Sequence, residues 1–407
     1  MTRAPLLLQG LRVLELGELV AGPFIGTLLG EFGAEVIKVE RPGRGDVLRQ
    51  FGPHVNGTGL YWLVNSRNKK SVVLDLQRPE GQEVLRDLIT RSDILIASLR
   101  PGTLEGCGFD EEFFSTSAPR LVVVYASAYG RLGPSRAKGG YDPVAQGFSG
   151  LSYVTGEPDG APMRAGGAIP ICDFMTGLLG ALGAVLALYD RDARGSRCGQ
   201  VVDVALYDMA FRMLGPLLTL YDLTGEVWQR QGNRSLGGAP TGHFRTLDAE
   251  WVCVSVQNDE QFRRCAQLVG YPEWAEDPRF ASLTSRTTHR AVIEAAMAEW
   301  IAKRPRDAVL SAFDEAGLVA GPINSMSDLA KDEHLAARGT TWDADPVLGR
   351  FRVPSVVPIL SRTPGASRTP APGIGEHTHE VLADLLQYSD ERLRTLETQK
   401  VIPPSSD

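Results

Sequence analysis

The chain has 407 residues, 43% of them hydrophobic and 22% charged, so it differs from disordered and fibrous chains and can build a sizeable core. A chain of this length is expected to fold as two domains, or as one large and one small domain. The net charge of −7 argues against a general attraction to nucleic acid or to an anionic membrane, and we expect neither as a partner.

The cysteines and the first residues indicate a reducing compartment. The five cysteines are scattered and form no CxxC pair, which disfavours a disulfide framework and a structural zinc site. The apolar run at 6–8 is followed by Gln9 and Gly10, so it is too short for the core of an export signal. We therefore expect a cytoplasmic protein without a metal site.

The first third of the chain alternates short apolar strands with helical patterns. This alternation is typical of βαβ units and predicts a parallel, doubly wound α/β sheet. The expected strands lie at 11–16, 35–40, 71–76, 93–99 and 120–126, and the expected helices at 23–32 and 79–91.

An uncharged stretch at 174–189 follows Asp173 and is shorter than the roughly 20 residues of a membrane span, so a buried helix is expected. Glycines at 177, 180 and 183 predict tight packing of this helix against a neighbour. The apolar pattern from 201 to 223 predicts further interior helix.

The sequence pattern changes near Gly225, where the long apolar runs end. A glycine-rich loop at 232–242 is followed by an expected strand at 251–256 and an expected helix at 260–269. We place a small α+β domain at 225–329. After it, a strand is expected at 351–359 and a last helix near Thr378.

The first predicted strand and helix are compatible with a dinucleotide-binding site in which Glu40 binds the ribose, but the spacing of the glycines does not support such a site. Gly17, Gly22, Gly26 and Gly30 form no GxGxxG pattern. The sequence also lacks GxxxxGK[ST], GxSxG and HExxH motifs, so phosphate-loop, serine-hydrolase and zinc-protease chemistry have no support.

Asp173 stands at the start of the apolar helix, after the segment AGGAIPIC. One interpretation is structural, because aspartate is a favoured N-cap that accepts hydrogen bonds from the first helical N–H groups. The other is catalytic, because a carboxylate kept ionised in a dry pocket is a candidate nucleophile. The two roles are compatible.

Several segments together resemble the class III CoA-transferase family, which includes formyl-CoA and carnitine CoA-transferases. In this order they extend over nearly the whole chain and are specific as a set. They are LRVLEL at 11–16 with AGP at 21–23, GAEVIKVERPG at 33–43 with GD at 45–46, NKKS at 68–71 with LDL at 74–76, RPG at 100–102, GYD at 140–142, the segment ending in Asp173, and GEHT at 375–378.

The resemblance implies transfer of CoA from an acyl-CoA donor, of which succinyl-CoA is one candidate, to a small carboxylic acid, with no permanently bound cofactor. Asp173 matches the covalent nucleophile, which would form a mixed anhydride and then an aspartyl-CoA thioester. Gly237 and Gly238 match the glycine-rich cover that keeps water from these intermediates. Tyr141 matches a position on the substrate side.

The resemblance also implies a CoA site. Arg41 matches a phosphate-binding arginine, whose planar fork suits phosphate oxygens. Further matching positions are Val20, Leu74, Gln77, Ser98, Leu99, Arg100 and Lys138. Gly106 replaces a basic residue of the formyl-CoA enzymes and Val20 replaces a polar amide, which argues against formyl-CoA and oxalate as substrates.

The fold that the resemblance implies has a Rossmann-like large domain built from both chain ends, 1–224 and 330–407. Two subunits would thread through each other as an interlocked homodimer. Two alternatives stay open, a 2-methylacyl-CoA racemase on the same scaffold and an inactive CoA-binding regulatory homologue. Racemases carry a histidine where Tyr141 stands, although Asp259 lies where they tend to have an acidic residue. Retention of Asp173 disfavours the inactive homologue.

Overall fold

A computed structural model describes residues 6–235 and 237–405. The chain forms two compact units. The large unit comprises the chain up to residue 152, residues 164–226, and the chain from residue 339 onward. The small unit comprises residues 153–163 and 227–338, so the segments 153–163 and 330–338 group with it.

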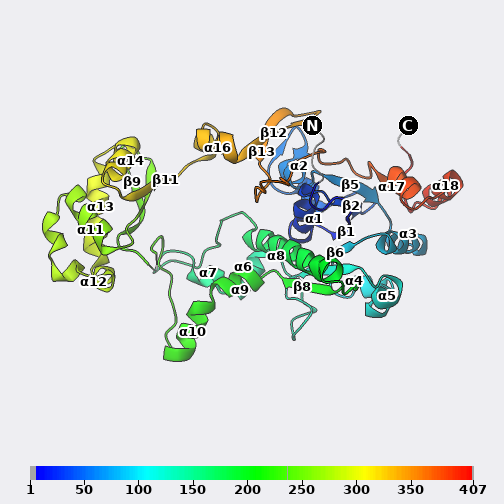
Figure 1. The fold of residues 1–407 in the computed structure, drawn as a ribbon, viewed down its shortest axis with the longest axis horizontal. Coiled ribbons are helices and arrows are strands. Elements are labelled where there is room, and N and C mark those ends of the chain that lie inside the picture. Colours follow the sequence, from blue (N-terminus) through cyan, green and yellow to red (C-terminus); the bar gives the residue numbers. More distant parts are fainter. Residues whose placement is uncertain (1–5, 236, 406–407) are drawn as a thin grey trace. The chain divides into compact units, whose positions relative to one another are not determined.

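The large unit is built on a six-stranded parallel sheet with the strand order β5-β2-β1-β6-β7-β8 (Figure 1). This confirms the predicted parallel α/β class. The chain first moves outward from β1 to β2 and β5 and then crosses to β6, so the direction of winding reverses between β1 and β6. The strands are β1 (Arg12–Gly17), β2 (Glu35–Glu40), β5 (Lys69–Val73), β6 (Ile94–Ser98), β7 (Val122–Ser127) and β8 (Val201–Ala205).

Both faces of this sheet are covered by helices, which explains why its strands are nearly continuous apolar runs. Alternate residues serve opposite faces, so Leu14 and Leu95 belong to one core cluster while Val13 and Ile94 belong to the other. The first face carries α3 (Pro79–Thr90), α5 (Glu111–Ser117), α17 (Thr378–Asp384) and α18 (Asp390–Thr398), and the second carries α1 (Ala21–Glu31) and α8 (Ile171–Leu188).

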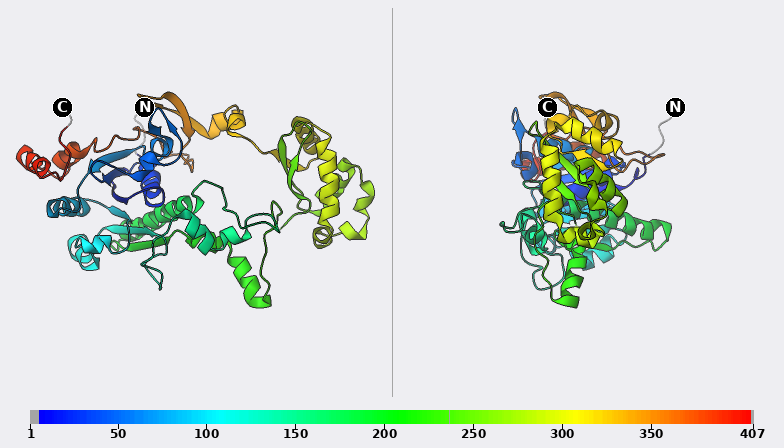
Figure 2. Two further views of the ribbon diagram at one scale, coloured as in Figure 1. Left: turned by 180° about the vertical axis from the view of Figure 1, so that it is seen from behind. Right: turned by 90° about the vertical axis from the view of Figure 1, so that its left-hand side faces the viewer.

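The C-terminal helices α17 and α18 lie beside the N-terminal half of the chain (Figure 2, left view). Tyr388 donates a hydrogen bond to Asp87 on α3, and His377 donates its backbone N–H to Ser71 on β5. The two ends of the chain therefore build one core.

Helix α8 packs tightly on α1 and the sheet, as the spacing of its glycines predicts. A Cβ atom at Gly177 would lie 2.8 Å from the Cβ of Phe24, and Cβ atoms at Gly180 and Gly183 would collide with Ile25 and Val202. The segment Ile171–Ala193 is long and apolar enough to cross a membrane, and half of the apolar 18-residue stretch within it is buried inside the chain.

The prediction of continuous interior helix from 201 to 223 is wrong. The first residues form β8, because this valine-rich run completes the sheet by pairing with β7, with Val123 opposite Val201. Two helices follow, α9 (Asp208–Met213) and α10 (Gly215–Thr224), and no residue of α10 is buried within the chain.

The small unit contains a three-stranded antiparallel sheet with the order β11-β10-β9. Strand β9 (Thr241–Arg245) begins inside the predicted glycine-rich loop, β10 (Trp251–Ser255) matches an expected strand, and β11 is Val319–Pro322. The core of the unit lies between this sheet and the helices α11 (Asp259–Val269), α13 (Arg290–Ala302) and α14 (Arg306–Glu315).

The remaining elements are short. They are β3 (His54–Val55), β4 (Thr58–Gly59), β12 (Thr340–Asp345), β13 (Gly349–Pro354), α2 (Leu60–Asn65), α4 (Thr103–Gly106), α6 (Asp142–Phe148), α7 (Leu151–Val154), α12 (Leu283–Thr288), α15 (Met326–Leu329) and α16 (Glu333–Arg338). The strand expected at 351–359 thus ends at Pro354, where it has paired with β12 as a hairpin.

Candidate functional site

The carboxyl ends of the parallel strands meet at one edge of the large unit's sheet, and a crevice at the point where the winding reverses is the usual ligand site of such sheets. Here that point lies between β1 and β6. Gly17 pairs with Ser98 across the two strand ends, and neither Gly17 nor Gly22 has room for a Cβ atom against Ser98. The turn from β1 into α1 is therefore packed directly on the end of β6.

A buried charge network holds this turn. Lys38 is fully buried, and its Nζ lies 2.8 Å from Glu15 and 2.6 Å from Asp46. Lys38 also donates to the carbonyl of Gly17, while Asp46 accepts the backbone N–H of Leu19. Sequence analysis did not single out this network, although the GD segment at 45–46 contains one of its members.

The residues predicted to bind CoA follow the carboxyl ends of five neighbouring strands, so the fold brings them to one edge. Val20 follows β1, Arg41 follows β2, Leu74 and Gln77 follow β5, Ser98 to Arg100 end β6, and Lys138 lies in the segment after β7.

Their accessibilities differ. Arg41 is exposed and forms an ion pair with Glu18, with its Nε 2.9 Å from Glu18 Oε1. Gln77 and Lys138 are also exposed. In contrast, the side chains of Leu74 and Val20 are buried in apolar clusters, so any contact of these two with a ligand would not come from exposed side chains.

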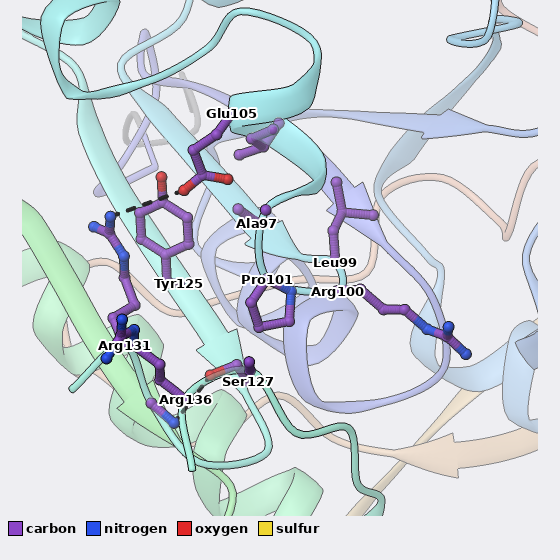
Figure 3. Close-up of a pocket in the computed structure, with 13 residues that line it drawn as sticks. Ala97, Leu99, Arg100, Pro101, Glu105, Tyr125, Ser127, Arg131 and Arg136 are labelled. Carbon is purple, nitrogen blue, oxygen red and sulfur yellow. Dashed lines mark hydrogen bonds and ion pairs between the residues drawn. The ribbon is translucent and has the colours of Figure 1, made fainter. Parts of the chain in front are cut away.

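A cleft of about 370 Å³ opens at the ends of β6 and β7 (Figure 3). Its lining includes Leu99 and Arg100 from the predicted set, and among the residues that sequence analysis missed are Glu105, Tyr125, Arg131 and Arg136. The guanidinium of Arg131 lies over the Tyr125 ring, 4.1 Å from its centroid. The cleft therefore combines apolar side chains with three arginines, of which Arg131 lies 3.9 Å from the carboxylate of Glu105.

Asp173 is the third residue of α8. The interpretation of Asp173 as the N-cap is wrong, because the N-cap is Pro170 and Asp173 lies within the first turn of the helix. The packing of the helix start explains where the carboxyl group lies. Phe174 packs edge-on against Phe24 at 4.8 Å, and α1 follows directly from β1, so Asp173 lies toward the carboxyl edge of the sheet.

The carboxyl group of Asp173 is nearly buried, with 8% of the residue exposed. Burial, together with the nearby charge of Asp142, raises its pKa to about 7. Within the described part of the chain it accepts no hydrogen bond and forms no ion pair, unlike most buried carboxylates.

Tyr141 and Asp142 adjoin this site through α6, which packs against α8. Tyr141 is the N-cap residue of α6 and is 66% exposed, so its hydroxyl is available to a ligand. Asp142 is buried, and its Oδ1 accepts the backbone N–H of Cys172 at 2.7 Å. The sequence shows Asp142 only as part of the GYD segment.

Gly237 and Gly238 belong to the small unit and differ in environment. Gly237 is exposed, whereas Gly238 is buried, and its carbonyl accepts a hydrogen bond from Arg290. A Cβ atom at Gly238 would lie 2.8 Å from the carbonyl oxygen of Val256, so this position requires glycine for packing. Residue 236 of the predicted cover lies outside the described residues.

Asp259 has a structural partner. It is the first residue of α11, and its Oδ1 accepts a hydrogen bond of 2.7 Å from Arg286. Arg286 is buried against the ring of Phe262. Across residues 6–235 and 237–405, no group of three His, Cys, Asp or Glu side chains has the arrangement to hold a metal ion.

Comparison with known proteins decides the family. The family model described as CoA-transferase family III matches residues 8–378. The chain belongs to CoA-transferase family III. It is a class III CoA-transferase, an enzyme that moves CoA from an acyl-CoA to a carboxylic acid.

Two relatives of this CoA-transferase match nearly its whole length. A succinyl-CoA–D-citramalate CoA-transferase of Chloroflexus aurantiacus is 39% identical over 98% of this chain and 99% of its own. A succinate–glutarate CoA-transferase of Agrobacterium fabrum is 34% identical over 93% of this chain and 95% of its own. Among solved structures, a CAIB/BAIF family protein from Brucella suis has a TM-score of 0.82 at 31% identity, over 94% of this chain and 100% of its own.

Proposed function

We propose that this CoA-transferase uses succinyl-CoA as donor and a small dicarboxylic acid as acceptor, with Asp173 as the covalent nucleophile. The names of the two relatives support the donor and the acceptor class. The observation that carries the role of Asp173 is its carboxylate, which is buried at the start of α8 and engaged by no hydrogen bond of the described structure.

The reaction begins when an oxygen of Asp173 attacks the thioester carbonyl carbon. The carbon–sulfur bond breaks, CoA leaves as a thiolate, and a mixed anhydride forms. The thiolate then attacks the aspartyl carbonyl, which releases the donor acid as a carboxylate and leaves an aspartyl-CoA thioester. The acceptor carboxylate repeats the two exchanges in reverse order and restores Asp173.

Each intermediate conserves the energy of the thioester and is open to hydrolysis, so the reaction benefits from a site that excludes water. We propose Gly237 and Gly238 as part of a cover that does so. Gly237 is the residue to test, because replacing the packed Gly238 would also disturb the small unit. Gly237→Val should increase hydrolysis relative to transfer, and an unchanged ratio of hydrolysis to transfer would contradict the cover.

For CoA, we propose contacts along the carboxyl edge of the sheet, with Arg41 at a phosphate and Ser98, Leu99, Arg100, Gln77 and Lys138 around the nucleotide and pantetheine. The exposure of Arg41 supports this role, because the guanidinium could exchange Glu18 for a phosphate. At Val20 and Leu74, whose side chains are buried, the backbone would form part of the wall of the CoA site. No permanently bound cofactor enters this scheme.

We also propose that the enzyme is a cytoplasmic homodimer with interlocked subunits and a large domain from both chain ends. Supporting the dimer, α8, α9 and α10 carry an exposed apolar surface that a second copy would cover. We call it the α8–α10 face, and its members are Leu178, Leu182, Leu186, Phe211, Met213, Leu218, Tyr221 and Leu223.

The test of the nucleophile is peptide mapping after reaction with succinyl-CoA and a rapid quench. A CoA adduct should map to Asp173, and Asp173→Asn should abolish both the adduct and transfer. Asp208→Asn is the matched control, because Asp208 is also an acidic residue in the first turn of a helix, α9. An adduct at another residue, or transfer at the wild-type rate in Asp173→Asn, would overturn the assignment.

Two observations support transfer over the racemase alternative. Asp259, which left some doubt, accepts a hydrogen bond from Arg286, and the relatives described above are named as transferases. Incubation with 2-methylacyl-CoA in heavy water gives a direct check. Deuterium uptake at the α-carbon without acyl exchange would favour racemisation.

A further inference from the structure

A carboxylate from another helix accepts a hydrogen bond from the backbone at the start of α8. The first N–H groups of a helix have no partner within the helix, and the N-cap Pro170 has no side-chain oxygen to offer. Asp142, on α6, supplies the missing acceptor through the bond from Cys172 N–H to its Oδ1 at 2.7 Å. Asp142 therefore accepts a hydrogen bond that an N-cap side chain would otherwise accept, and Asp173 is not needed as an acceptor there.

The second oxygen of Asp142 is also engaged. Its Oδ2 accepts hydrogen bonds from Gln146 Nε2 and from Arg164 Nη2, each at 2.8 Å. Asp142 is 2% exposed and Gln146 is 0% exposed, so this arrangement is built into the interior. The charge of Asp142 is thus balanced by Arg164 and saturated with donors.

The same residues fix the segment that leads into α8. Gln146 Oε1 accepts the backbone N–H of Ala165 at 2.9 Å, and its Nε2 donates to the carbonyl of Ala165 at 3.3 Å. With Arg164 held by Asp142 at one end of this segment and Cys172 held by Asp142 at the other, the loop 164–170 is anchored at both ends.

We propose that Asp142, held by Arg164 and Gln146, is a positioning residue that keeps the Asp173 carboxylate free to attack the thioester. A carboxylate that accepts several backbone N–H bonds is stabilised as an anion and loses basicity. Asp142 takes that role at the helix start, so Asp173 stays unbonded and more basic. The inference rests on the proposed function of Asp173 as nucleophile.

The charges around Asp173 agree with this geometry. The pKa of Asp173 is raised to about 7, first by burial and second by the negative charge of Asp142 on α6. Arg164 faces Asp142 rather than Asp173. The neighbouring Cys172 thiol has its pKa raised to about 12 by burial and by the two carboxylates, so it is neutral at ordinary pH. On α9, the carboxylate of Asp208 accepts a hydrogen bond from the backbone N–H of Ala205. The first two turns of α1, which also packs against α8, contain no charged residue.

Two variants test the proposal through opposite shifts of the pH profile. Asp142→Asn removes the negative charge at nearly constant size, so the acid limb of kcat/KM should move to lower pH than in the wild type. Arg164→Gln leaves the charge of Asp142 without its counterion, so the acid limb should move to higher pH. Both should lower kcat by about 10-fold or more while KM for succinyl-CoA stays within about threefold, because neither residue belongs to the proposed CoA site.

Asp208→Asn is the matched control and should keep the wild-type pH profile, since Asp208 also accepts a backbone N–H at a helix start. Melting curves identify any variant that fails to fold, and Arg164, which is 38% exposed at its side chain, provides the milder substitution. Unshifted acid limbs in both variants, or shifts in the same direction, would overturn the inference.

Adduct mapping separates this inference from the proposed function. If the wild type and Asp142→Asn both carry the CoA adduct on Asp173 but share one pH profile, the positioning role is wrong and the nucleophile stands. If the wild type carries no adduct on Asp173, the proposed function itself is wrong.

Discussion

At the scale of single residues, the protonation of Asp173 controls when the proposed nucleophile is present. Attack on a thioester requires the anion, and burial plus the charge of Asp142 raises the pKa of this carboxyl to about 7. The protonated and inactive form therefore dominates below that value. A solvated aspartate would be ionised throughout this range.

We predict that kcat/KM rises about 10-fold per pH unit below pH 7 and levels off above it, because this ratio reports the ionisation of the free enzyme. The measurement is the initial rate of transfer at low succinyl-CoA concentration between about pH 5 and pH 9. A flat profile down to pH 5 would show that Asp173 is already ionised there and would contradict its desolvated state.

Arg41 gives a second prediction at this scale. Arg41→Ala should raise KM for acyl-CoA by roughly 5- to 20-fold and leave kcat nearly unchanged, because a phosphate contact remote from the thioester contributes equally to the ground and transition states. Arg44→Ala is the matched control, since it removes the same charge from the same exposed loop. An equal effect of both substitutions would indicate a general charge effect rather than a contact.

The gathering of the proposed CoA residues at one edge was predictable at this scale, because they were assigned through short segments that follow strands, and carboxyl ends of parallel strands share an edge. The surroundings of Asp173 were not. Asp142 is 31 positions upstream of Asp173, and the hydrogen bond that it accepts from Cys172 depends on how α6 packs against α8. Sequence spacing carries no information about that packing.

At the scale of elements, the close contact between α8 and α1 depends on glycines, which have no side chain to separate the two helices. A Cβ atom at Gly177 would lie 2.8 Å from the Cβ of Phe24 and 3.1 Å from the carbonyl oxygen of Ala21. Because a backbone carbonyl cannot move aside as a flexible side chain can, even a methyl group there would force the helices apart. The two helices carry Asp173 and the β1–α1 turn.

We predict that Gly177→Ala lowers the free energy of unfolding by about 1 to 3 kcal/mol. Gly147→Ala on α6 should have the opposite sign and raise it by about 0.5 kcal/mol, because that position faces open space and alanine favours the helix. Chemical denaturation of the two variants beside the wild type measures both. Equal effects of the two substitutions would show that the contact between α1 and α8 is not tight.

The elements also show where sequence patterns fail. Strand β2 was predicted with its observed bounds, since its apolar residues stand between clear turns. Strand β8 was missed because its valines run on into the apolar residues of α9, and only pairing with β7 distinguishes strand from helix there. Strand β9 was missed because glycines at its start resemble a loop, although β10 fixes it on one side.

At the scale of the whole molecule, the α8–α10 face has no partner within the described chain, and apolar surface of this extent is typical of an interface. A second copy of the chain is the occupant that the proposed interlocked dimer provides. Threaded subunits cannot separate without partial unfolding, so such a dimer would resist dilution.

We predict that the protein remains a dimer in native mass spectrometry at about 10 nM, because an obligate dimer has no stable folded monomer. Leu182→Glu, in the α8–α10 face, should reduce the yield of soluble dimer severalfold. Leu247→Glu is the matched control, because Leu247 on the small unit is also an exposed leucine, 64% against 54% for Leu182. A folded monomer of the wild type would rule out interlocked subunits.

The joining of both chain ends in one core has a consequence for synthesis. Val381, Leu382, Leu393, Leu396 and Ile402 complete the apolar cluster on one face of the sheet, and they leave the ribosome after all six strands of that sheet. Until then, that face of the nascent sheet stays open to solvent, however completely the strands have formed. Chaperones that bind apolar surface during translation should therefore engage this chain until α17 and α18 have emerged, and truncation before α17 should yield insoluble protein.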